Sequence, residues 1–313
     1  EQYGADILRI WVVGSDYSED LRLGPEILKH QADLYRRIRN TLRYLLGNLD
    51  GFDESERVGA ADMPELERWV LHRIWEMDRL VRQTTDDFNF HAQWTALHNF
   101  CAVELSAFYF DIRKDALYCD GPDSARRRAA RTVLDTLFSH LTAWLAPILC
   151  FTAEEAWLAR AGDGDADSVH LRTYPEAPDD WRDDALAKKW ETVRRVRRVV
   201  TGALEIERAE KRIGSSLQAA PTVYADADTV SIMEGLDLAE IAITSDARLV
   251  VGDAPEGAFT LPDVDGIGVV PALAEGEKCA RCWQVLPDVG THEHPDVCAR
   301  CDAAVDRHPR AAE

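Results

Sequence analysis

Four cysteines near the end of the chain offer the clearest chemistry in the sequence. They form two C-x2-C pairs separated by fifteen residues: Cys279, Cys282, Cys298 and Cys301. Each C-x2-C turn can place two sulfurs on one ion, and four thiolates complete a tetrahedral Zn2+ shell. The nearby cations Lys278, Arg281 and Arg300 favour the thiolate form that metal binding requires. The spacing therefore predicts one zinc site.

This zinc is expected to be structural, because protein sulfurs fill all four positions and leave none open for water or substrate. A tail of about 40 residues buries too little apolar surface to fold alone, so the metal would supply the missing stabilisation. His292, His294 and Asp296 lie between the pairs and are potential substitute ligands. With four cysteines available, they are left out of the shell. The alternative is a reduced or disulfide-paired tail.

The chain contains seven cysteines and no recognisable export signal. An odd number of cysteines without such a signal favours a reducing cytoplasm and metal binding over disulfides. Cys101 and Cys150 lie in apolar helical segments and are expected to be core thiols. Cys119 has no base or metal partner that the sequence identifies.

The composition is typical of a soluble globular protein, with 46% hydrophobic and 29% charged residues. A length of 313 residues suggests two or three domains. No run of about 18 apolar residues exists that could span a membrane. The first residues lack an initiator Met and do not resemble a signal peptide, which suggests a fragment whose N-terminal part is missing.

The net charge of −20 argues against nucleic-acid binding driven by overall charge. Cationic residues are nevertheless concentrated in three runs, at 125–131, 188–198 and 207–212. Each run alone could be a solvated helix face balanced by nearby acids. Several such runs in an acidic chain indicate a polyanionic partner that is held locally.

The hydrophobic periodicity predicts a mainly α fold. Pro25 begins a long helical pattern that stops at Gly47 and Asn48. The arginines of this helix cluster opposite its apolar stripe: Arg36, Arg39 and Arg43. Further amphipathic segments at 66–81, 94–108 and 133–145 complete a helical bundle with short connections.

Two local patterns follow in the bundle region. Thr152 and Glu155 have the spacing of a capping box that starts a short helix. The loop at 162–168 imitates a calcium-binding loop, but Ser168 and Tyr174 stand where glycine and glutamate are required. We interpret it as a solvated turn.

A long charged helix is expected from Asp183–Asp184 to about Arg212. The sequence pattern after this helix predicts a small α+β unit. Its expected strands are 217–225, 239–245, 248–252 and 266–273, with a helix at 228–236. The predicted division of the chain is a connector at 1–24, a bundle at 25–182, the long helix and α+β unit at 183–271, and a zinc module at 272–313.

No catalytic motif is recognisable: the sequence shows no phosphate-cradling glycine loop, nucleophile elbow, H-E-x-x-H or paired catalytic carboxylates. No catalytic residue is therefore assigned. Such a chain is more easily explained as a binding part than as an enzyme on its own.

Several long strings resemble bacterial isoleucyl-tRNA synthetases. They are YGADILRIWV (3–12), DYSEDLRLGPEILK (16–29), YRRIRNTLRYLLGNL (35–49), DIRKDALYCD (111–120), WLAPILCFTAEEAW (144–157), EKRIGSSLQA (210–219) and the KCARCW…CARC tail. The resemblance covers essentially the whole chain in order. Valyl- and leucyl-tRNA synthetases share the bundle, but the four-cysteine tail together with RIGSSL resembles the isoleucine enzyme.

The resemblance implies an anticodon-binding bundle, a junction unit and a zinc module, placed after a class I catalytic core. The family joins isoleucine to tRNA(Ile) with ATP and edits misactivated valine in an inserted domain. The HIGH and KMSKS motifs and the editing domain are absent from this sequence. The chain alone is therefore expected to be inactive, to need ATP only as part of the parent enzyme, and to be a cytoplasmic monomer that partners tRNA(Ile) and the missing domains.

For an anticodon-binding part, the cationic face of the long helix predicts contacts to RNA phosphates by Arg36, Arg39 and Arg43. Trp283 is a candidate for stacking on an unstacked base, with Arg281 beside it; packing against the zinc module is the alternative. Lys211 and Arg212 are expected near RNA at the junction, although a helix-dipole role would also suit them.

Two other classes stay open. One is a DNA-binding or repair protein with a similar zinc tail, as in formamidopyrimidine-type glycosylases, which would carry an N-terminal catalytic Pro-Glu. Glu1 and Gln2 do not supply it. The other is a structural interaction module in which the basic runs pair with acids.

Overall fold

The computed structural model describes residues 3–16, 20–161 and 167–307. The chain forms two compact units. The first, called the bundle unit below, comprises Glu1–Arg113 and Asp123–Asp183. The second, called the C-terminal unit, comprises Lys114–Pro122 and Asp184–Glu313. Each unit is described by itself.

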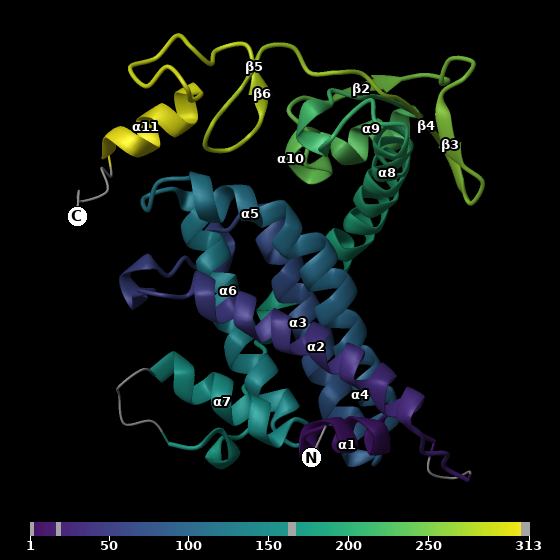
Figure 1. Ribbon diagram of the computed structural model, residues 1–313, viewed down its shortest axis with the longest axis vertical. Helices are drawn as coiled ribbons and strands as arrows, with labels where there is room; N and C mark the ends of the chain where they lie inside the picture. Colours follow the sequence, from purple (N-terminus) through teal and green to yellow (C-terminus); the bar gives the residue numbers. More distant parts are fainter. Residues whose placement is uncertain (1–2, 17–19, 162–166, 308–313) are drawn as a thin grey trace. The chain divides into compact units, whose positions relative to one another are not determined.

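The bundle unit is helical (Figure 1). Its α-helices are α1 (Ala5–Val13), α2 (Pro25–Asn48), α3 (Glu65–Asp86), α4 (Phe90–Asn99), α6 (Ala125–Leu145) and α7 (Cys150–Ala161). Short 3-10 turns connect them: η1 (Glu54–Glu56), η2 (Ala60–Asp62), η4 (Val169–Leu171) and η5 (Asp179–Trp181). Helix α2 packs against α1, α6 and α7, and α3 packs against α4 and α6. The prediction of a mainly helical chain is confirmed.

Helix α2 follows the predicted pattern. Gly24 is its N-cap residue and Pro25 occupies the first turn, where a missing N–H costs nothing. Ile38, Leu42 and Leu45 lie on one face and are buried. The spacing of these residues at three and four positions thus fixes which side of α2 faces the core.

The helix predicted at 94–108 is longer than expected. After α4 the chain continues through a π-helical segment, η3 (Phe100–Tyr109), and then through α5 (Phe110–Cys119) without leaving the helical region. Cys101 lies within the π segment and is fully buried, so it is the core thiol that the sequence predicts. From Lys114 onward, α5 belongs to the C-terminal unit.

A buried ion pair lies inside the bundle unit. Glu67 of α3 accepts hydrogen bonds from Nε and Nη2 of Arg113, the second at 2.7 Å, and both side chains are almost fully buried. The Tyr109 hydroxyl donates to Glu67 Oε1 at 3.1 Å. Burial and the neighbouring carboxylate raise the pKa of Tyr109 well above its usual value, so this hydroxyl keeps its proton.

The predicted capping box at Thr152 and Glu155 is wrong. Helix α7 begins at Cys150, so Thr152 already lies inside its first turn. The cap is instead the buried carboxylate of Asp6 in α1, which accepts bonds from the N–H of Phe151 at 3.3 Å and of Thr152 at 2.9 Å. A carboxylate from a distant segment satisfies the free N–H groups that a local serine or threonine usually caps.

The C-terminal unit contains the long helix α8 (Asp184–Ala209), which ends slightly before the predicted Arg212. A four-stranded sheet has the order β2-β1-β4-β3. Its strands are β1 (Thr222–Ala225), β2 (Arg248–Val251), β3 (Phe259–Leu261) and β4 (Val264–Val270). Strand β1 runs parallel to β2 and antiparallel to β4, with Val223 opposite Val269. Helix α8 packs on β3 and β4, where Gly202 leaves room for the ring of Phe259.

One predicted strand is wrong and another was missed. Residues 239–245 were expected to be a strand, but α10 (Leu238–Ala242) occupies the segment. Asp237 caps this helix by accepting from the N–H of Glu240, and Ile243 ends it in the left-handed conformation at φ 58°. The helix predicted at 228–236 is confirmed as α9 (Ala227–Met233). Strand β3 had not been predicted.

The interpretation of the loop at 162–168 falls largely on residues 162–166, which lie outside the described residues. The predicted four-part division of the chain stays a prediction. Among the described residues, no helix combines the length and apolar character needed to cross a membrane.

Candidate metal centre and nucleic-acid interface

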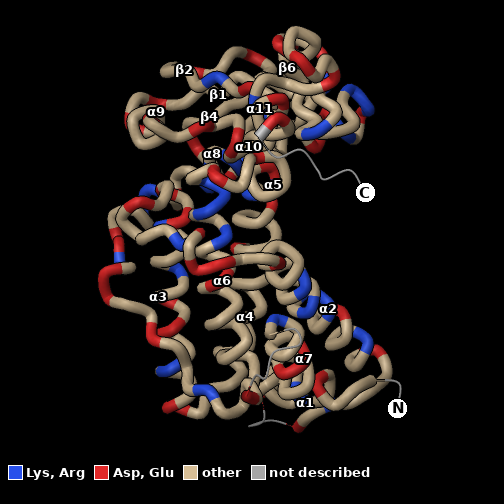
Figure 2. Tube along the Cα trace, turned by 90° about the vertical axis from the view of Figure 1, so that its left-hand side faces the viewer, with Lys and Arg blue, Asp and Glu red and all other residues tan. Residues whose placement is uncertain are grey.

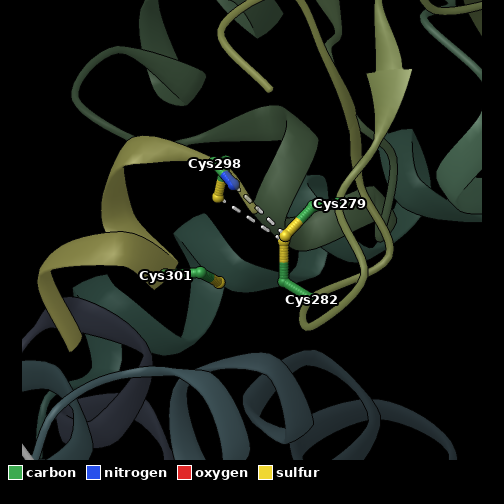
Figure 3. Close-up of side chains that lie close together, drawn as sticks. All are labelled: Cys279, Cys282, Cys298 and Cys301. Carbon is green, nitrogen blue, oxygen red and sulfur yellow. Dashed lines mark hydrogen bonds between the residues drawn. The ribbon is translucent and has the colours of Figure 1, made fainter. Parts of the chain in front are cut away.

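The four predicted metal ligands lie together in the C-terminal unit (Figure 3). The sulfurs of Cys279, Cys282, Cys298 and Cys301 all lie within 4.8 Å of one another, and all four residues are buried and free of disulfides. Two of these sulfurs, those of Cys282 and Cys298, are 3.8 Å apart. Because a Zn–S bond is about 2.3 Å, a tetrahedral site has sulfur–sulfur edges of about 3.8 Å. The donor set therefore fits zinc.

A short hairpin and a helix position the sulfurs. Strands β5 (Glu277–Lys278) and β6 (Val285–Leu286) flank the first cysteine pair, and the second pair lies at the start of α11 (Ala299–Arg307). Gly276 has φ +116°, and a Cβ there would lie 2.3 Å from the backbone of Leu286. Only glycine suits this position, since it combines a left-handed conformation with close backbone contact.

Backbone N–H groups prepare one sulfur for a cation. Burial opposes ionisation of Cys279, but N–H groups of Cys282, Cys298 and Arg281 lower the pKa of its thiol to about 6. The hydrogen bond with Cys119 has the largest effect on Cys301. Together with smaller effects of both signs, it raises the pKa of this thiol to about 12. Adjacent sulfurs cannot all ionise without a compensating positive charge, so a bound cation would displace the remaining protons.

The histidines of the connecting loop bind carboxylates. His292 Nε2 lies 3.1 Å from Asp288 Oδ2, and His294 Nδ1 lies 2.9 Å from Asp302 Oδ1. The hydrogen bond to Asp302 also raises the pKa of His294. These pairings support a shell made of sulfurs alone.

Residues 114–122 form a platform against the metal-ligating segment, within the same unit. Arg300 donates to both carboxylate oxygens of Asp115 and, at 3.1 Å, to Asp120. Arg281 donates to the carbonyl oxygens of Cys119 and Tyr118. The two arginines therefore tie the cysteine cluster to the end of α5.

Cys119 is the largest correction at this site. The sequence identified no partner for it, yet it is packed in one buried cluster with the four predicted ligands. Its Sγ donates to the carbonyl oxygen of Arg281 at 3.8 Å. The separation of 162 residues between these two positions leaves no local spacing signal that could reveal the contact.

Trp283 occupies an unusual position at the metal-ligating hairpin. Its backbone has φ +66°, a left-handed conformation that is rare for a bulky side chain. The residue is 61% exposed, and Lys278 Nζ lies 5.3 Å from the ring centroid. The hairpin therefore holds an indole ring open to solvent, with a cation at its face.

The predicted arginines of α2 are exposed. Figure 2 shows Lys and Arg recurring along this helix, and its two acidic residues, Glu26 and Asp33, precede the arginines. Arg36 pairs with Asp33 at 2.9 Å. Arg39 makes two bonds of 2.7 Å to Glu155 of α7. Arg39 and Arg43 also line a groove of about 190 Å³ between α2 and α7, whose floor includes Leu42 and Ala156.

Lys211 and Arg212 follow the end of α8. Lys211 has φ +59°, and Arg212 donates twice to Glu207 at 2.6 Å. Glu210 also pairs with Arg212. The predicted RNA contacts thus form three sets: Arg36, Arg39 and Arg43 on α2, Lys211 and Arg212 after α8, and Arg281 and Trp283 at the cysteine cluster.

Residues 67–223, half of the chain, match the family described as "Anticodon-binding domain of tRNA ligase". The chain belongs to this family. A second match, to "Zinc finger found in FPG and IleRS", covers residues 276–304 and includes all four clustered cysteines. The zinc-finger family occurs in both FPG and IleRS proteins, so this match alone does not distinguish the two classes. The anticodon-binding match makes the distinction for this chain.

The curated relatives carry the name "Isoleucine--tRNA ligase". Those of Ruegeria pomeroyi and Brucella abortus are each 56% identical over 97% of this chain, and that of Caulobacter vibrioides is 51% identical over the same share. The chain spans 31% of each relative. A solved ternary complex of LeuRS, tRNA and LeuAMS from Agrobacterium radiobacter matches 59% of this chain and 20% of its own, at 16% identity and a TM-score of 0.41.

Two neighbours of the predicted RNA-contact residues are not identified by the sequence. Glu155, assigned to a helix cap, is the partner of Arg39. Lys278, assigned only to thiolate stabilisation, also lies over the Trp283 ring. Nearness in sequence carries the second signal, because β5 and β6 place Lys278 opposite Val285, two residues after Trp283.

Proposed function

We propose that this chain is the anticodon-binding and zinc-binding part of an isoleucine–tRNA ligase. The observation that carries the proposal is the presence, in one chain, of the anticodon-binding match and the zinc-finger match. Identity of 56% to isoleucine–tRNA ligases supports it. In the whole enzyme, ATP-dependent joining of isoleucine to tRNA(Ile) would take place in a catalytic domain. We also propose a cytoplasmic monomer.

We propose that Cys279, Cys282, Cys298 and Cys301 hold one structural Zn2+. Bound zinc would supply folding free energy, and four sulfur ligands leave no coordination position for substrate. Gly276 allows the backbone of the hairpin to close. Arg281 ties the hairpin to residues 118–119.

We propose that Trp283 stacks on an unstacked base of the anticodon loop. A left-handed conformation costs a bulky residue on the order of 1–3 kcal/mol, which needs support from its surroundings. Here the strained backbone exposes the ring and does not bury it. Lys278 beside the ring would meet the adjacent phosphate. Arg281 already donates to carbonyl oxygens of α5. We therefore propose that it orients the hairpin that carries Trp283, and that the part of its guanidinium group not used in these bonds contacts RNA.

Replacing Trp283 by alanine is expected to weaken tRNA(Ile) binding by about 1–3 kcal/mol, the usual value of one base–aromatic stack. Zinc content should stay at the wild-type level, since the side chain is exposed. Filter binding with metal analysis measures both quantities. Trp283→Phe serves as the matched variant and should retain most of the affinity. Unchanged binding in the alanine variant would remove Trp283 from the interface.

We propose that Arg36, Arg39 and Arg43 contact phosphates of the anticodon stem-loop, and that Lys211 and Arg212 contact RNA beyond α8. For Arg39, Glu155 must be exchanged for a phosphate, because its carboxylate occupies the same guanidinium edge. Glu155 would therefore orient Arg39 before RNA binds. It would also lower the net free energy gained when Arg39 exchanges the carboxylate for a phosphate.

Replacing Arg39 by glutamine is expected to reduce the slope of log K against log salt concentration by about 0.7–0.9, the loss of one phosphate contact. Titrations at several salt concentrations measure this slope. The matched variant Glu155→Gln breaks the same ion pair but keeps the cation, so its slope should match wild type and its affinity should rise. Equal slopes in all three proteins would contradict a phosphate contact by Arg39.

The proposed function is tested by titrating the zinc-loaded chain at low salt with tRNA(Ile) and with the same tRNA carrying a different anticodon. Tighter binding of the native anticodon is the expected result. Equal binding of both tRNAs would contradict anticodon reading by this chain. A preference for duplex DNA would favour a repair-type protein, and indifference to every nucleic acid would favour a structural module.

A further inference from the structure

A fifth thiol lies against the metal centre. Cys119 is only 6% exposed and belongs to the same buried cluster as the four clustered cysteines. This cluster packs Cys119 together with Cys301, whose sulfur is one of the four predicted metal ligands. Four sulfurs already complete a tetrahedral shell, so the proposed zinc site leaves this fifth sulfur without a role.

The surrounding contacts hold the two sulfurs together. One Arg281 nitrogen donates to the carbonyl oxygen of Cys119 and lies 3.7 Å from the sulfur of Cys301. One position before Cys301, Arg300 is bound through both nitrogens to Asp115, one turn before Cys119 in α5. Arg300 therefore holds α11, and Arg281 the metal-ligating hairpin, against the end of α5.

The other two cysteines outside the predicted zinc shell lack such a neighbour. Cys101 is fully buried in the π-helical segment, and burial raises the pKa of its thiol to about 12. The thiol of Cys150 donates to the carbonyl oxygen of Pro147 at 3.9 Å. Cys119 is thus distinguished by its contact with a sulfur that zinc would use.

We propose that Cys119 and Cys301 form a thiol-oxidation site for small peroxides, at which a disulfide removes one ligand from the metal centre. The proposal rests on the four-cysteine metal site proposed above. Cys119 retains a small exposed edge, which suits an oxidant as compact as hydrogen peroxide. Larger oxidised thiols are excluded by the same burial.

The reaction balances in two steps. The Cys119 thiol attacks one peroxide oxygen, the O–O bond breaks, and sulfenic acid and water form. The Cys301 thiolate then attacks the sulfenic sulfur, the S–S bond forms, and hydroxide leaves. Each sulfur loses one electron, and the peroxide accepts both. A dithiol reductant reverses the change by thiol–disulfide exchange.

The experiment uses the full chain after its zinc content has been measured. Stoichiometric hydrogen peroxide is added, zinc release is followed with a chromophoric chelator, and disulfides are mapped by mass spectrometry without reduction. We expect a Cys119–Cys301 cross-linked peptide to appear with zinc release. Dithiothreitol and added zinc should restore the starting state.

Cys119→Ser should bind zinc like wild type and release it at least several-fold more slowly under peroxide, while Cys150→Ser should behave as wild type. A disulfide map of the wild-type chain with only Cys279–Cys282 or Cys298–Cys301 links would overturn the proposal, whether or not the Cys119 variant folds. Absence of zinc at the start would instead refute the metal site, so the two failures are distinguishable.

Discussion

Replacement of Cys298 by serine is expected to abolish zinc binding and unfold residues 276–304. The four sulfurs lie within 4.8 Å of one another, and little other apolar surface is buried with them: Val297 is buried, while Leu286 and Val289 are only partly buried. Zinc supplies about 10–16 kcal/mol to comparable finger peptides, far more than a segment this small gains by burial. The proposed zinc is therefore expected to be the main source of stability for this segment.

Metal analysis should show a fall from one zinc per chain to nearly none, and limited proteolysis should cut within 276–304. Cys150→Ser is the matched control, because Cys150 belongs to the bundle unit and is not one of the four clustered cysteines. Hydrogen exchange at residues 114–122 should also increase, since Arg281 and Arg300 hold this segment. The helicity of the bundle unit should persist. Its collapse would contradict independent folding of the two units.

Replacement of Glu67 by glutamine is expected to destabilise the bundle unit by about 3–5 kcal/mol, the usual effect of breaking a buried ion pair. Glutamine keeps the size of the side chain but removes the carboxylate charge that faces Arg113, which is 2% exposed. The Tyr109 hydroxyl loses a charged acceptor as well. The loss of the negative charge dominates the expected effect, because the side-chain volume is nearly unchanged.

Urea denaturation followed by circular dichroism measures this loss. The double variant Glu67→Gln with Arg113→Met removes both charges and should regain most of the lost stability. Glu155→Gln is a surface control, since its pair with Arg39 is exposed to solvent; its midpoint should stay near that of wild type. A single Glu67 variant as stable as wild type would show that the pair contributes nothing to the bundle.

The correct sequence predictions rest on short-range signals. The apolar spacing of α2 and its initial proline identified the helix and its buried face, and the C-x2-C pairs identified the cysteine cluster. Both signals are complete within a few turns of chain. The anticodon-binding and zinc-finger family matches agree with the resemblance found in the sequence.

The wrong predictions have one local cause and one distant cause. Residues 239–245 are rich in isoleucine and alternate in character, but the Asp237 cap and the turn at Ile243 select a helix. Thr152 has the spacing of a cap, yet Asp6 reaches the same N–H groups from α1. The RNA contacts assigned to individual arginines stay predictions, because exposure alone does not identify a ligand.

The contacts of residues 114–122 also set an order of events during synthesis. Asp115 meets Arg300 only after a further 185 residues have been made, and Tyr118 meets Arg281 after 163. At about 5–20 residues per second, the first interval lasts on the order of ten to forty seconds. The end of α5 leaves the ribosome long before the arginines that hold it. Residues 114–122 are therefore synthesised well before their partners, and they reach their final contacts only after Arg281 and Arg300 have emerged.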